Sequence, residues 1–432
     1  MRKVLSAAAA LGMCLTLPAA ALAGAGLSDE QILKELEYLR NKVASQQEHI
    51  DALGAMVDKK VSAKVEEEVK KSGTSKVALA NKFIDQLTLK GDLRARYEIR
   101  DRDYKDTSTS TDVSRDRWRT RFRLGGVWDN KEENWQVGAG LASGSDDPTS
   151  TNDTWSEAKP FETGDIRLDY AYAKHKWNDF AFTIGQHENP YKSSWVFWDG
   201  DVRLAGLTGQ YGGKEGVFAT LGGYSAKLVN DDNTATLVAG QAGYNGKVGE
   251  VKYTLAAGYH TYSKSLINEG TADFLLDKVD EDKYELNIGD LYGKVSFPAG
   301  DVKLSLYGQI WQNFGADGNI GQSQAGSSFT LKPEDADMGW VLGADAKYGA
   351  FKLGYAYSVV EADSLFGYLS DSDFGDGLSK TNKKGHRVQA GYEITKNWSA
   401  DVTWLSFERD EDYVAAKEDQ VDIYQFDVTY KF

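Results

Sequence analysis

The stretch Arg115–Trp128, R-D-R-W-R-T-R-F-R-L-G-G-V-W, decides the fold of this chain. Guanidinium groups occupy every second position, namely Arg115, Arg117, Arg119, Arg121 and Arg123. The positions between them, from Trp118 onward, are mostly apolar or aromatic. Successive side chains of a strand point to opposite faces, so a strand here carries five cations on one face and an apolar row on the other. A helix would spread the arginines around its whole circumference.

Two kinds of sheet fit this alternation. A soluble sheet would bury the aromatic row and leave the arginines in water, whereas a membrane barrel turns its apolar row outward around a polar lumen. Similar segments recur to the end of the chain, without a second sheet or helices to cover their apolar faces. The sequence therefore predicts an all-β fold, a 16-stranded antiparallel transmembrane β-barrel that begins near Leu87.

The connections between the predicted strands alternate in length. Short turns are expected at 129–133, 177–179, 212–216, 246–249, 298–301, 348–350 and 395–397. Long polar loops are expected at 101–114, 144–164, 188–201, 228–234, 263–283, 315–337, 361–385 and 409–419. Short periplasmic turns and long outer loops are typical of outer-membrane barrels. Two local features complete the prediction: a bulge near Gly289–Asp290, and Tyr170 and Tyr172 on the outer face.

The N-terminal region predicts two further segments. Residues 1–23 have the charged start, apolar core and Ala21-Leu22-Ala23 site of a secretory signal peptide. Residues 24–85 are predicted to form a short α-helical coiled-coil segment and a linker in the periplasm, ahead of a barrel domain at 86–432. Its apolar residues follow steps of four and three from Ile32 to Val57, with Gln46 as the polar seam residue. A helix packed on or inside its own barrel is the alternative.

Composition limits the possible functions. The net charge of −15 argues against nucleic acid as a partner. Cys14 lies within the predicted signal peptide, so neither disulfides nor thiol chemistry are expected in the mature chain. The last strand places Tyr424, Phe426, Val428, Tyr430 and Phe432 at alternate positions, as a lipid-facing row would.

Several motifs resemble those of a family of bacterial outer-membrane proteins called "putative porins". They are G-S-D-D-P-T-S-T-N-D-T-W at Gly144–Trp155, I-R-L-D-Y-A-Y at Ile166–Tyr172, G-Q-H-E-N-P-Y at Gly185–Tyr191 and W-D-G-D-V-R-L-A-G-L at Trp198–Leu207. The resemblance implies a porin-like barrel in the outer membrane but supplies no substrate. In trimeric porins the loop between the fifth and sixth strands folds into the pore. In this chain that loop corresponds to residues 188–201.

These considerations give candidate site residues. The predicted pore-lining residues are Arg94, Arg96, Arg100, Arg115, Arg117, Arg119, Arg121, Arg123 and Arg167. The candidates for a constriction loop are Glu188, Trp195, Trp198, Asp199 and Asp201. An acidic loop opposite a basic wall would produce a transverse field. Alternatively, the arginines pair with neighbouring carboxylates and only hold the wall rigid, and the sequence does not decide between these readings.

Catalysis has little support in the sequence. The histidines show no metal-binding spacing, and His187 next to Glu188 is the single catalytic candidate for a barrel hydrolase. We predict no cofactor and no metal site, and we expect Asp-rich runs such as Asp371–Asp376 to be solvated loop tips.

The functional prediction is a porin of the Gram-negative outer membrane, a water-filled channel for passive diffusion of small polar solutes and ions. A homotrimer in outer-membrane lipid is expected by analogy with porins. The basic wall predicts a preference for anionic solutes, because loop carboxylates are screened by salt beyond about 8 Å. A barrel hydrolase and an envelope tether that uses the coiled coil are the alternatives.

Overall fold

The computed structural model describes most of the barrel and part of the N-terminal region. The described residues are 33–34, 36–52, 86–103, 113–230, 233–268, 284–317, 320–324, 327–331, 335–376, 378–410 and 420–432. The chain divides into two compact units, Met1–Lys70 and Lys71–Phe432. The predicted signal peptide and the predicted linker before residue 86 lie outside the described residues.

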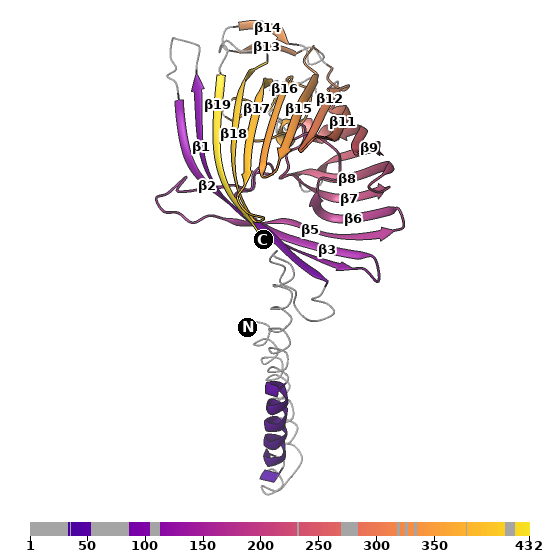
Figure 1. Ribbon diagram of the computed structural model, residues 1–432, viewed down its shortest axis with the longest axis vertical. Coiled ribbons are helices and arrows are strands. Elements are labelled where there is room, and N and C mark those ends of the chain that lie inside the picture. The colour runs from indigo at the N-terminus through magenta and orange to yellow at the C-terminus, as the bar shows by residue number, and fades with distance from the viewer. Residues whose placement is uncertain are drawn as a thin grey trace. The chain divides into compact units, whose positions relative to one another are not determined.

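Sixteen strands of the second unit form a closed antiparallel barrel. They are β1 (Leu87–Asp103), β2 (Val113–Asn130), β3 (Trp135–Ser143), β5 (Ile166–Trp177), β6 (Phe180–Glu188), β7 (Arg203–Tyr211), β8 (Gly216–Asn230), β9 (Asn233–Val248), β10 (Val251–Tyr262), β11 (Asn287–Ala299), β12 (Val302–Asn313), β15 (Met338–Tyr348), β16 (Phe351–Val360), β17 (Lys383–Glu393), β18 (Trp398–Arg409) and β19 (Gln420–Lys431). Each strand pairs with the next along this series. The ring closes between β19 and β1, which lie side by side in Figure 1. The predicted fold class is confirmed.

Smaller elements lie in the long connections. Strand β4 (Asp153–Thr154) pairs with β2, and β13 (Ile320–Gln324) pairs with β14 (Ser327–Leu331) as a separate hairpin. The α4 helix (Lys264–Asn268) follows β10, and the 3-10 helix η2 (Gly367–Leu369) lies between β16 and β17. Among the described residues, no helix has both the length and the apolar character needed to cross a membrane.

Side-chain exposure follows the predicted alternation. The outward positions of β1 and β2 include Leu93 and Trp118, which are exposed, whereas the inward positions include Arg96 and Glu98, which are buried. On β19 the outward residues Tyr424, Phe426 and Val428 are exposed, while the residues between them are buried. An apolar outer face of this kind is stable only when lipid, rather than water, surrounds it.

The predicted bulge near Gly289–Asp290, in β11, is wrong. The register of β11 with both of its neighbours runs without a shift through Gly289 and Asp290. The apolar alternation in the sequence changes phase there because Ile288 faces inward, where it is buried in an apolar cluster inside the barrel.

A register shift occurs instead between β3 and β5, at Gly140 and Leu141. It turns Tyr170 and Tyr172 to the inner face, so their predicted outward position is wrong. Their rings lie against the wall at Gly140 and Gly138, where an added Cβ would come within 2.4 and 2.5 Å of ring carbons. Inward-facing glycines thus leave the space that the tyrosine rings occupy.

Two predictions outside the barrel wall have different outcomes. Strand β8 extends to Asn230 and β9 begins at Asn233, so the predicted long loop at 228–234 is wrong.

In the N-terminal unit, residues 33–34 and 36–52 are helical, which agrees with the predicted helix over that range. Its apolar residues Leu36, Val43 and Ile50 are exposed, and self-association through them stays a prediction.

Two long connections fold into the lumen, one at 189–202 and the other at 361–382. The first buries Val196 and Phe197, and the second buries Leu365 and Phe374. Together with inward residues of the wall, such as Trp311, they form one apolar cluster. The interior of the barrel is therefore partly filled by the protein itself, and the remaining space defines the candidate site.

Candidate functional site

The inner face of β1 and β2 carries a ladder of arginines whose register brings like charges together. Arg94 lies opposite Arg121, Arg96 opposite Arg119, and Arg100 opposite Arg115. Like charges directly opposite each other destabilise a sheet, so this wall needs carboxylates close to its guanidinium groups.

Carboxylates of the wall itself meet part of this need. Asp92 accepts hydrogen bonds from Arg121 and Arg123, with the shortest N–O distance to each at 2.8 Å. Glu98 is almost fully buried and accepts from Nε of Arg117 at 2.5 Å. On the neighbouring strand β19, Asp427 accepts from Nε of Arg96 at 2.7 Å and lies 3.5 Å from Arg94.

The connection 361–382 supplies the remaining carboxylates. Asp373 accepts from Arg96 at 2.9 Å and lies 3.9 Å from Arg119. Asp376 accepts from Arg100 at 2.8 Å and from Arg115 at 2.7 Å. The prediction that Asp371–Asp376 is a solvated loop tip is therefore wrong, because the segment is drawn into the lumen by the arginines.

The other predicted basic residue, Arg167, lies apart from this ladder. Its guanidinium donates to the backbone carbonyls of Ser145, Asp147 and Ser150, so it holds the connection between β3 and β5. Asp169, two positions further along β5, binds Arg203 at 3.1 Å.

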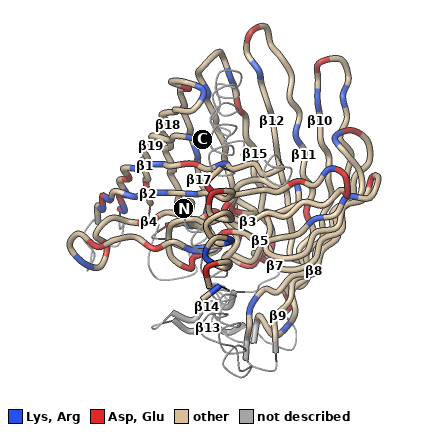
Figure 2. The backbone as a smooth tube through the Cα atoms, turned by 90° about the horizontal axis from the view of Figure 1, so that it is seen from below, with Lys and Arg blue, Asp and Glu red and all other residues tan. Residues whose placement is uncertain are grey.

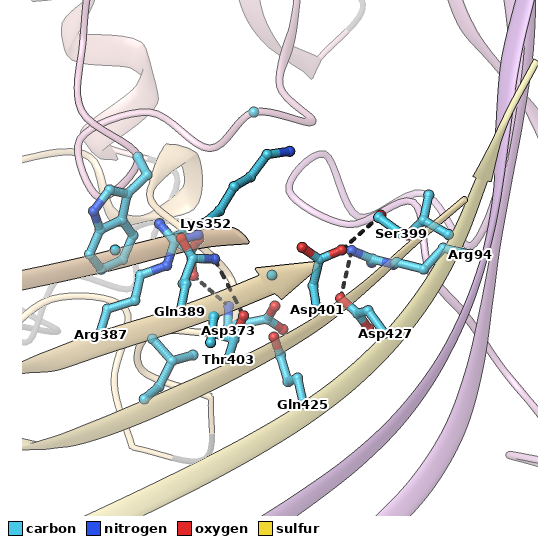
Figure 3. Close-up of a pocket in the computed structure, with 18 of the residues that line it drawn as sticks. Arg94, Lys352, Asp373, Arg387, Gln389, Ser399, Asp401, Thr403, Gln425 and Asp427 are labelled. Atoms are coloured by element: carbon cyan, nitrogen blue, oxygen red, sulfur yellow. Dashed lines mark hydrogen bonds and ion pairs between the residues drawn. The ribbon is translucent and has the colours of Figure 1, made fainter. Parts of the chain in front are cut away.

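A polar cavity of about 720 Å³ lies between the infolded connections and the wall. Arg94, Arg96 and Arg121 of the predicted set line it, together with Trp195, Asp199 and Asp201 of the predicted constriction loop. Figure 3 shows Arg94 beside Asp427 on one side and Arg387 with Gln389 on the other. The structure thus brings the basic wall and the acidic loop to the same cavity.

The remaining loop candidates lie elsewhere. Trp198 is buried, and its ring centroid lies 5.6 Å from that of His260 in the apolar cluster. Glu188 ends β6 and lines a separate cavity of about 260 Å³ that also contains Tyr170 and Tyr172.

The two infolded connections contact each other at Asp199. Its backbone N–H donates to the carbonyl of Leu369 at 2.7 Å, and its carboxylate lies 3.4 Å from the backbone nitrogen of Ser372. Burial, and then the charge of Asp371, raise the pKa of Asp199 to about 9. Burial also acts on Asp373, but the charges of Arg96 and Arg119 outweigh it and hold the pKa of that carboxyl well below its usual range.

Sequence reasoning missed a second basic wall opposite the arginines. Lys303, Lys347, Lys352 and Arg387 also line the 720 Å³ cavity. The guanidinium carbon of Arg387 lies 4.4 Å from the ring centroid of Trp195, as in a cation–π contact. Each of these residues occupies an inward position of an alternating strand, so strand phase could have identified them, but they are spread over four strands rather than gathered in one motif.

The catalytic candidate His187 is an ordinary buried histidine in its contacts. Its Nε2 lies 3.0 Å from Oγ1 of Thr208, and its Nδ1 lies 2.8 Å from the backbone carbonyl of Glu188. Both ring nitrogens are occupied by structural partners, so this arrangement offers no free base for a nucleophile.

Comparisons with known proteins agree with this architecture. A family model described as "Putative porin" matches residues 100–286 and 285–432. The high-pH structure of Pseudomonas putida OprB is 12% identical, with a TM-score of 0.52 over 80% of this chain and 94% of that one. Salmonella typhi OmpF in complex with daunomycin is 14% identical, with a TM-score of 0.48 over 80% and 97%. The likeness to OprB shows the fold alone, and no curated protein matches.

We predict that Asp373→Asn combined with Asp376→Asn will widen the conducting path. The change removes the carboxylates that attach the connection 361–382 to five arginines, and it adds two net positive charges to the lumen. Single-channel conductance in planar bilayers should rise, and the zero-current potential should shift toward anions. Asp179→Asn, in a turn between β5 and β6, is the control. An unchanged conductance in the double variant would contradict this role of the connection.

A second prediction concerns pH. The loop contact at Asp199 binds a proton that a solvated carboxyl would release near pH 4, so its stability falls as pH rises from about 4 to about 9. Conductance or gating frequency should therefore increase between pH 5 and pH 9 and level off above. Asp199→Asn keeps the group neutral and should abolish the change. A pH response that persists in this variant would place its origin elsewhere.

Proposed function

Because the chain belongs to the family described as "Putative porin", we propose that it is a porin for the passive diffusion of small polar solutes and ions. The observation that carries the proposal is a polar cavity of about 720 Å³ inside a closed barrel whose outer face is apolar. Family and fold indicate an outer-membrane channel of Gram-negative bacteria.

The exposed outer face supports membrane insertion in detail. Large apolar side chains are exposed on consecutive strands, for example Phe182 on β6, Leu207 on β7, Leu221 on β8 and Val238 on β9. Aromatic residues near the ends of strands, such as Trp177, suit the membrane interface. The seven short turns lie at one end of the barrel, and the long connections lie at the other end together with the tight β8–β9 hairpin, so the turn end is assigned to the periplasm.

The inner face supports a channel rather than an enzyme. The cavity is lined by charged and amide side chains from strands on both sides of the lumen, and His187 is held by structural contacts. Lumen charges of both signs then act on passing solutes by electrostatics and pore radius. We assign the channel a preference for anions, because cations line both sides of the cavity while Asp199 has a raised pKa.

The assembly and the N-terminal segment complete the proposal. A homotrimer is inferred by analogy with porins, and residues 24–85 are assigned to the periplasm as a coiled-coil helix and linker. The exposed seam residues Leu36, Val43 and Ile50 support self-association of that helix.

The proposal predicts stepwise, ohmic conductance when the purified chain is added to planar bilayers. Steps grouped in threes, and a detergent-corrected mass of three chains by light scattering, are expected for the trimer, whereas a monomer mass contradicts it. Hydrolysis of lipid or peptide without channels would favour the hydrolase. If deletion of residues 24–85 detaches the envelope but leaves conductance intact, the tether gains support.

The role of the arginine ladder has its own test. Arg119→Ala combined with Arg121→Ala removes two cations whose carboxylate neighbours, Glu98 and Asp92, remain. The lumen becomes more negative, so the anion-to-cation permeability ratio from zero-current potentials should fall at least about twofold. An unchanged potential would identify these arginines as supports of the wall that do not act on passing ions.

A further inference from the structure

A row of lysines crosses the inner wall near the turn end of the barrel, on other strands than those that carry the arginine ladder. Lys247 on β9 lies directly opposite Lys252 on β10, and Lys347 on β15 lies opposite both Lys303 on β12 and Lys352 on β16. These positions face inward because their strand neighbours, such as Val248 and Leu353, are exposed on the outer face. In Figure 2 lysines and arginines are marked in blue along the strands, including the labelled β10, β11 and β12.

Like charges directly opposite each other again destabilise the sheet. In this row a carboxylate compensates them at one place. The carboxylate of Glu393 binds Nζ of Lys347 at 2.9 Å and Nζ of Lys352 at 2.8 Å. Within the described part of the chain, Lys247, Lys252 and Lys294 make no ion pair and no side-chain hydrogen bond. Three ammonium groups on the adjacent strands β9, β10 and β11 therefore have no carboxylate partner among the described residues.

Hydroxyl side chains lie beside these three lysines, and the hydroxyl of Thr254 donates to Asn245 at 2.9 Å. Lys294 lies opposite Thr254, two positions from Lys252, and Lys252 lies opposite Ser296. Ser296 and Ser305 on β12 share a hydrogen bond of 2.7 Å between their hydroxyls. Among the described inward positions of β9 to β12, the carboxylate is Asp290, which is buried far from the turns and held by His260 and Gln309. Glu250 and Asp301 in the turns form no ion pair with the lysines of this row in the described structure.

We propose that Lys247, Lys252 and Lys294 form a binding subsite for the oxyanion group of a solute, a phosphate or a carboxylate, at the inner mouth of the lumen. Glu393 shows the geometry that such a group would take, because one carboxylate there bridges two lysines of adjacent strands. At Lys247 and Lys252 the same register pair occurs without an internal carboxylate, so a passing anion supplies it. The inference rests on the proposed porin function and moves the main attraction for anions from the arginine ladder to the lysines.

The contrast with the arginines supports this assignment. The eight ladder arginines are contacted by six carboxylates, so much of their charge is compensated inside the protein. A lysine also forms weaker and more exchangeable contacts than an arginine fork, which suits a site that solutes enter and leave.

The test is the block of chloride current by oxyanions in planar bilayers at about pH 8. Inorganic phosphate is added to both chambers and the half-blocking concentration is determined; succinate replaces it in a second series. Lys247→Gln combined with Lys252→Gln should raise the half-blocking concentration at least about fivefold, since two exposed charge contacts are removed. Lys214→Gln combined with Lys396→Gln is the matched control, because these lysines lie in turns at the same end and the net charge changes equally.

Each outcome bears on the proposal. If both probes block the first variant more weakly and the control behaves like wild type, the result supports a general oxyanion subsite. If only the block by phosphate weakens, the subsite is restricted to phosphate. If only the block by succinate weakens, it is restricted to carboxylates. Equal block in wild type and the first variant, or equal loss in the control, overturns it. Absence of channels in wild type contradicts the porin function itself, while channels that neither probe blocks contradict this inference alone. Heat-modifiable mobility on gels verifies that each variant is folded.

Discussion

The arginine ladder on β1 and β2 is the constraint on which the arrangement of the lumen depends. Three arginine pairs face one another in register, and the β-barrel wall cannot carry that charge without counter-ions. Asp92 and Glu98 come from the same wall, but Asp373 and Asp376 come from a connection about 260 residues further along the chain. Electrostatic attraction therefore explains why a long polar connection that could extend into solvent is held inside the barrel.

Once that connection lies inside, apolar packing keeps it there. Phe374, which follows Asp373 in the chain, is fully buried, with its ring centroid 5.2 Å from that of Phe407. The same phenyl ring lies 5.3 Å from Trp195 of the other infolded connection. Burying one such ring contributes roughly 1.5–3 kcal/mol, and here the ring is buried against both the wall and the other connection. Charge thus selects the position of the segment, and aromatic contacts fix the two connections to each other.

Local sequence patterns are sufficient to predict the strands of the barrel, but they are insufficient to predict which segments fill its interior. Outward rows such as Tyr424, Phe426 and Val428 depend on strand phase alone, which is why strand positions and their inward arginines could be predicted. The position of Asp376 depends on contacts across hundreds of residues, and no pattern within 361–382 distinguishes it from a solvated loop. Tyr170 was misassigned for a related reason: the register shift next to it is set by pairing with β3, and an apolar ring against inward glycines looks in sequence like a lipid-facing residue.

The difference between local sequence pattern and long-range contacts also applies to the cations in the lumen. An arginine such as Arg96 is held by Asp427 and Asp373, and these two carboxylates compensate its charge inside the protein. A lysine such as Lys252 lies on a wall whose described inward positions near it carry no carboxylate, so in the proposal above its charge acts on mobile ions. A count of positive residues along the sequence gives arginines and lysines equal weight. It indicates the arginines as the site that attracts anions, because they are clustered. Counting the carboxylates that fold against each cation points to the lysines, and that count requires the tertiary structure.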